Sequence, residues 1–140
     1  MDIQKKKAIG ISLIILVTTA AIVGLLFVEP IPQDPGYHQF QDSKLILTIP
    51  NFRNVVSNIA FFIVGVLGVI KLRETERLKI IPDIKFVYYC LFSGMILVAF
   101  GSGFYHIRPD NQTLVWDRLP MTIIFMALFS IVIVRADFKM

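Results

Sequence analysis

Charged residues are scarce in this chain. They make up 17% of its 140 residues, whereas 56% of the residues are hydrophobic. Soluble domains carry about 25% charged residues, so the deficit excludes an ordinary soluble domain, and the apolar excess excludes a disordered chain. The apolar residues form continuous rather than alternating runs, which disfavours a membrane β-barrel. We therefore expect an all-α integral membrane protein with a single membrane domain over residues 1–140.

Cysteine is almost absent as well, since Cys90 is the only one. A lone cysteine excludes an intramolecular disulfide and a C-x-x-C metal pair. The net charge of +4 could indicate a nucleic-acid partner, but the lysines and arginines lie at the ends of apolar runs. There they are better explained as membrane topology signals than as a phosphate-binding patch, so no nucleic-acid partner is expected.

Four apolar runs predict four transmembrane helices, because a bilayer core needs roughly 20 apolar residues per helix. The spans cover about residues 8–28, 55–72, 86–105 and 120–134. Lys5, Lys6 and Lys7 precede the first run, as in a signal peptide. That run is longer than a signal core and no small-residue cleavage site ends it, which favours an uncleaved anchor helix.

The distribution of positive charge predicts the orientation. Of the 14 lysines and arginines, four fall on one side of the predicted membrane, and that side is expected to face outward. Both termini are then cytoplasmic, and the loops 29–54 and 106–119 face outward together. The four outward residues are Lys44, Arg53, Arg108 and Arg118.

The strongest chemical pattern lies near the end of the third run. Ser102 and His106 are four residues apart, so a helix places them on one face. Asp117 follows in the next loop, where the chain can fold back towards them. Other readings stay open: His106 as a headgroup contact, Asp117 as a helix N-cap with Pro120 in the first turn, and Ser102 bonded back to the preceding turn.

Ser102, His106 and Asp117 contain the residue types of a serine hydrolase triad. A serine and a histidine stacked on one helix do not form the strand–turn–helix elbow of such enzymes. A histidine that holds a metal, with a nearby carboxylate that moves protons of a metal-bound water, suits the spacing better.

A second polar pattern opens the second run. Asn54, Ser57 and Asn58 follow helical spacing and form one stripe. The stripe predicts either hydrogen bonds between helices or the polar wall of a buried cavity. Gly65 and Gly68, one turn apart, indicate close helix packing.

Two blocks of this sequence resemble the alkaline ceramidase family, within the superfamily that also includes the progestin and adipoQ receptors. The first block runs from Pro50 to Asn58 and continues to Gly65. The second contains Ser102, His106 and the stretch Trp116 to Thr122. The resemblance extends over about residues 37–134.

The resemblance implies a seven-helix hydrolase that cleaves the amide bond of ceramide. It implies zinc held by three histidines, of which His106 would be one, a proton-transferring Asp117 and a hydrogen-bonding Ser102. It also implies an N-terminal calcium site, to which Asp42 and Asn51 correspond. His38 and Phe40 stand where further carboxylates are expected, so we do not expect calcium here.

The family's other two zinc histidines form an H-x-x-x-H pair on its last helix. This sequence has two histidines in all, and His38 is the only second candidate ligand. We therefore expect the N-terminal part of the family bundle, as a truncated product, a fragment or half of a split protein. Self-association or a C-terminal half chain could complete the site. The alternative is a receptor-like or degenerate, non-enzymatic relative.

Overall fold

A computed structural model describes residues 2–74 and 80–137 of the chain. The chain divides into two units, Met1–Pro32 and Gln33–Met140. The first unit holds one helix, α1 (Ile3–Leu25). Apolar side chains lie on all sides of the helix, which is typical of a helix that spans a membrane.

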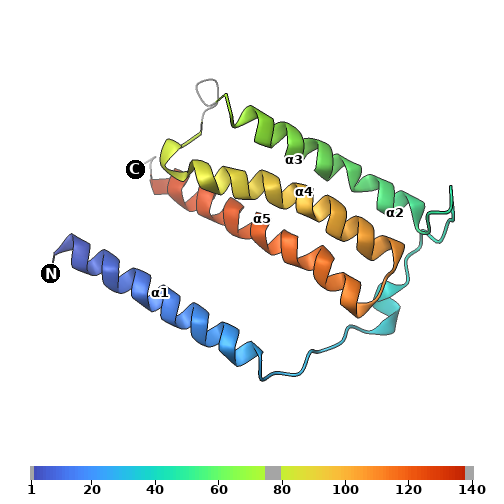
Figure 1. The fold of residues 1–140 in the computed structure, drawn as a ribbon, viewed down its shortest axis with the longest axis horizontal. Helices are drawn as coiled ribbons and strands as arrows, with labels where there is room; N and C mark the ends of the chain where they lie inside the picture. Colours follow the sequence, from blue (N-terminus) through green and yellow to red (C-terminus); the bar gives the residue numbers. More distant parts are fainter. Residues whose placement is uncertain (1, 75–79, 138–140) are drawn as a thin grey trace. The chain divides into compact units, whose positions relative to one another are not determined.

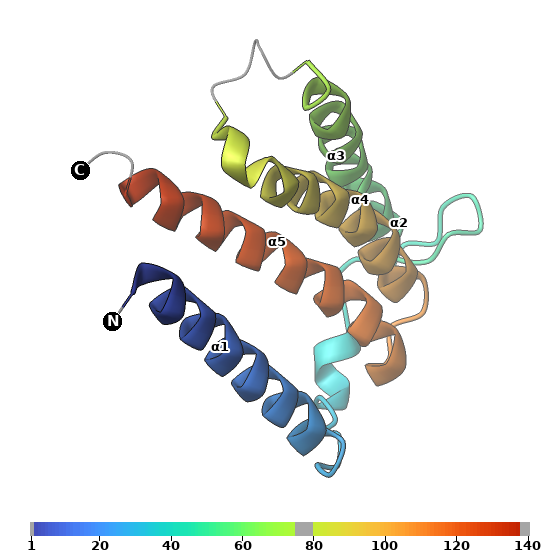
Figure 2. The same cartoon turned by 60° about the vertical axis from the view of Figure 1, so that its left-hand side comes forward.

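The second unit is a layer of three long helical segments (Figures 1 and 2). The helices are α2 (Phe52–Ser57), α3 (Ile59–Lys71), α4 (Lys85–Ile107) and α5 (Asn111–Asp137). The short 3₁₀ helices η1 (Pro35–His38) and η3 (Pro82–Ile84) precede α2 and α4. Because α4 packs against both α3 and α5, it is the central helix of the layer.

Small residues set the distance between these helices. A methyl group added at Gly65 would lie 2.8 Å from the carbonyl oxygen of Phe92 on α4. At Gly68 it would overlap the Phe92 ring. The predicted close packing at Gly65 and Gly68 is therefore confirmed, and the partner is α4.

Four segments in the described part of the chain are long and apolar enough to cross a membrane. They are Gln4–Leu25, Phe52–Lys71, Pro82–Ile107 and Asn111–Ala136. This confirms the predicted all-α membrane fold with four spans. The placement of both termini in the cytoplasm stays a prediction.

The start of the last helix differs from the prediction. We expected a loop up to residue 119, but α5 begins at Asn111 and contains Pro120. The loop between α4 and α5 is therefore short. Membrane helices tolerate an internal proline because neighbouring helices can compensate for the lost hydrogen bond.

The first turn of α5 explains where that helix starts. Asp110 Oδ1 accepts a hydrogen bond from Thr113 N at 2.7 Å, and Asp110 N donates to Thr113 Oγ1 at 3.1 Å. This reciprocal pair satisfies backbone groups at the start of the helix, as in a capping box. Pro109 ends α4 just before it, because a proline disfavours helical conformation in the residue that precedes it.

Candidate functional site

Ser102 lies on the inner side of α4 and is 7% exposed. In the described residues, no hydrogen bond joins its hydroxyl to Val98, the residue one turn earlier, whereas Ser130 does donate to Met126 O at 2.8 Å. The interpretation that Ser102 bonds back to the preceding turn is therefore wrong in this structure. Its hydroxyl is available to a molecule in the adjoining cavity.

The close approach of α4 and α5 brings Asp117 near Ser102. A methyl group at Gly101 would overlap the carbonyl oxygen of Trp116, so only glycine lets the two backbones approach this closely. Trp116 is four residues before Pro120, and Pro120 has no N–H to donate to that carbonyl. The reading of Asp117 as an N-cap is wrong, because Asp117 lies inside α5.

Ser102 and Asp117 line one cavity of about 410 Å³ between α3, α4 and α5. Asn58 is the third polar residue of its wall, and the others are apolar. The apolar members are Phe61, Val98, Met121, Ile124 and Phe125. A cavity of this kind suits an apolar ligand with a small polar centre.

His106 lies one turn beyond Ser102 on α4 and is not part of that cavity wall. Its ring packs against Phe40, with 4.7 Å between ring centroids. Its Nδ1 atom is buried and has no hydrogen-bond partner in the described part of the chain. A buried ring nitrogen without a partner is uncommon, and it leaves His106 free to bind a further group.

His38, the other histidine, is already engaged at both ring nitrogens. Its Nδ1 lies 3.0 Å from the Tyr105 hydroxyl, and its Nε2 lies 3.3 Å from Asn111 Oδ1. Asn111 Oδ1 also accepts a hydrogen bond from Gln33 N at 2.9 Å. His38 thus links the segment before α2 to the C-terminal end of α4 and the N-terminal end of α5.

The two residues of the predicted calcium-like site serve separate contacts. Asp42 Oδ2 accepts hydrogen bonds from Arg53 N at 2.7 Å and Asn54 N at 3.3 Å, which caps the N-terminus of α2. Asn51 adopts a left-handed conformation with φ of 49°. Its Nδ2 donates to His106 O at 2.8 Å, so it ties α2 to the end of α4.

The polar stripe bonds within its own helical segment rather than to a neighbouring helix. Ser57 Oγ and Asn58 Nδ2 both donate to Asn54 O, at 2.9 and 2.8 Å. The prediction of hydrogen bonds between helices is therefore wrong for these two groups. Ser57 is exposed and Asn58 is buried, so the cavity-wall reading holds for Asn58 alone.

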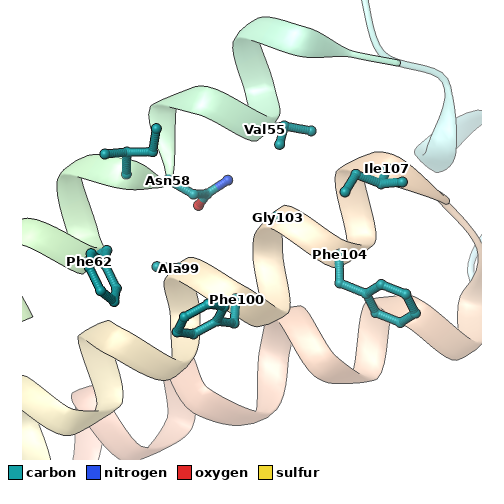
Figure 3. Close-up of a pocket in the computed structure, with 9 residues that line it drawn as sticks. Val55, Asn58, Phe62, Ala99, Phe100, Gly103, Phe104 and Ile107 are labelled. Carbon is teal, nitrogen blue, oxygen red and sulfur yellow. The ribbon is translucent and has the colours of Figure 1, made fainter. Parts of the chain in front are cut away.

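Asn58 also lines a second cavity of about 410 Å³ between α3 and α4 (Figure 3). Helix α4 contributes Ala99, Phe100, Gly103 and Phe104 to this cavity. Apart from Asn58, its lining residues are apolar or glycine. The sequence alone did not single out this cavity, because side chains from two separate runs form it.

A family model described as Ceramidase matches residues 41–139. This match covers α2 to α5 with all the cavity residues. The chain belongs to the ceramidase family. No curated protein and no solved structure matches the chain.

Membership of the ceramidase family raises the question of zinc. The unpartnered, buried Nδ1 of His106 fits a zinc ligand. No group of three histidine, cysteine, aspartate or glutamate residues gathers in the described part of the chain, and a catalytic zinc takes three protein ligands. The described residues therefore supply one suitable ligand and do not form a complete zinc site.

Proposed function

We propose that this chain is a ceramidase-like membrane hydrolase that cleaves the amide bond of ceramide or a related N-acyl lipid. The observation that carries the proposal is that Ser102 and Asp117 line one cavity whose other walls are mostly apolar. The apolar walls suit acyl chains, and the two polar groups suit the reacting amide. The family match supports the same chemistry.

The two polar groups would divide the work. Asp117 would take a proton from the attacking water and pass it to the amine nitrogen as the C–N bond breaks. The Ser102 hydroxyl would donate a hydrogen bond to the oxygen that gains charge on the former carbonyl. Water would add OH to the acyl carbon and H to nitrogen, so the products are a fatty acid and a sphingoid amine.

We propose that His106 is one ligand of a zinc ion. When bound, zinc would supply Lewis-acid activation of the water. The remaining ligands would come from a second copy of this chain or from another polypeptide segment, since His38 is engaged elsewhere. If so, chelation should stop hydrolysis in membranes that hold the protein, and added zinc should restore it. We also propose that the reaction takes place at the outward side of the membrane.

The test is fatty-acid release from N-acyl sphingosine by membranes that hold the full chain. Asp117→Asn should lower the rate about 100- to 10,000-fold, the usual worth of a general base. Asp83→Asn is the control, because Asp83 is exposed and precedes the opposite end of α4. Equal rates for wild type and Asp117→Asn would contradict the proposed role.

A non-enzymatic relative is the second candidate. The observation that favours it is that no group of three metal-ligating residues gathers in the described residues. It predicts that Asp117→Asn leaves the cellular role of the protein intact. Loss of that role, with normal membrane insertion, would contradict it.

A further inference from the structure

Asn58 is a buried polar residue near the start of the apolar span Phe52–Lys71. It is 6% exposed and lies between α2 and α3, at the point where the two short helices meet. Its amide nitrogen donates to Asn54 O at 2.8 Å. No hydrogen bond to its Oδ1 is found among the described residues, so this acceptor is open to a ligand.

The position of Asn58 is as informative as its burial. It is the one residue shared by the walls of the two cavities of about 410 Å³. The cavity between α3 and α4 is otherwise apolar, and the other cavity holds Ser102 and Asp117. Figure 3 shows the Asn58 side chain reaching towards α4 at the first of these cavities.

We infer that Asn58 is a specificity residue that binds the amide group of the lipid through Oδ1. This inference rests on the proposed function. An N-acyl lipid offers an N–H donor that matches the open acceptor. Its acyl chain would lie in the cavity between α3 and α4, so that the amide is next to Ser102 and Asp117.

This placement gives a reason to prefer amides over esters. An ester with the same chains has an oxygen where the amide has its N–H, so Asn58 Oδ1 would be buried without a donor. A buried polar group without a partner is unfavourable. The expected discrimination is about 10- to 100-fold in affinity.

The experiment compares two fluorescent lipids, N-acyl sphingosine and its isosteric ester, on the full chain in detergent micelles. Equilibrium binding is measured for wild type, Asn58→Leu and Ser57→Ala. Ser57 is a matched control, because its hydroxyl donates to the same carbonyl as Asn58 but lies exposed outside both cavities.

Wild type and Ser57→Ala should bind the amide about 10- to 100-fold more tightly than the ester. Asn58→Leu should lose this preference, because the amide no longer has an acceptor for its N–H and the ester no longer leaves Asn58 Oδ1 without a donor. Equal loss of both lipids would show a structural role and overturn the inference. So would a wild type without preference, a result that does not depend on the folding of any variant.

Binding and hydrolysis separate this inference from the proposed function. An amide preference that depends on Asn58, without any fatty-acid release, would contradict the proposed function alone. Fatty-acid release by a protein whose amide preference survives Asn58→Leu would contradict the role of Asn58 alone.

Discussion

The proposed site is built from individual residues, of which the sequence singled out Ser102, His106 and Asp117. The spacing of Ser102 and His106 predicted one helix face, and both lie on α4. Their surroundings differ, because Ser102 lines a cavity whereas the His106 ring packs against Phe40. Spacing could not predict this, because the packing partner comes from a distant segment before α2.

Ser102 gives the sharpest prediction at this scale. Ser102→Ala should lower the rate of amide hydrolysis about 100- to 1,000-fold, the usual cost of removing one donor to a developing oxyanion. Lipid binding should change little, because the hydroxyl acts mainly when charge develops. Steady-state rates with N-acyl sphingosine measure this. A rise in KM with an unchanged kcat would contradict the role.

Asp110 predicts a pH effect at the start of α5. Its hydrogen bonds with Thr113 hold the pKa of the carboxyl below its usual value, and the nearby Arg108 adds to the effect. The stability from this lowered pKa is therefore present above pH of about 3.9, the ordinary value for aspartate. It is lost as the pH falls through the lower pKa of the folded protein.

Asp110→Asn keeps a capping side chain but cannot ionise. Its unfolding temperature should therefore fall less than that of wild type between pH 5 and about pH 3. Thermal unfolding in detergent at several pH values measures the difference. Parallel curves for the two proteins would contradict this account of Asp110.

At the scale of the elements, the sequence predicted four helices because long apolar runs are a strong signal. Where the last helix begins was harder to predict. Pro120 suggested a helix start, but the Asp110 and Thr113 pair starts α5 nine residues earlier. A proline marks a first turn only where no earlier cap exists, and the packing of Trp116 against Gly101 supports the longer helix.

The contact between α4 and α5 gives a prediction with a matched control. Gly101→Ala places a methyl group onto the Trp116 carbonyl oxygen, and backbone cannot move aside as a flexible side chain can. The cost should be about 1–3 kcal/mol of stability, as for other overpacked sites. Thermal unfolding in detergent measures it.

Gly103→Ala is the control for Gly101→Ala, because nothing lies within 4 Å of a methyl group there. It is on the same helix and should leave stability almost unchanged. Similar destabilisation in both variants would contradict the account of the α4–α5 contact. Such a result would indicate that alanine destabilises this part of α4 whether or not it contacts α5.

At the scale of the whole molecule, most of the helical surface is apolar and exposed. In one apolar 18-residue stretch of each candidate span of the second unit, 17% of the residues are buried, and in that of Gln4–Leu25 none is. In a bilayer this surface contacts lipid or protein. Helix count and hydropathy were predictable from the sequence for that reason, whereas the two cavities depend on how three separate helices meet.

We propose that water cleaves an N-acyl lipid at this protein. The most direct measurement is mass spectrometry of the fatty acid released from N-acyl sphingosine in H₂¹⁸O by membranes that hold the wild-type chain. We expect release above that of membranes without the protein, with one ¹⁸O atom in each fatty acid. Release no greater than in membranes without the protein, or a fatty acid without ¹⁸O, would contradict it.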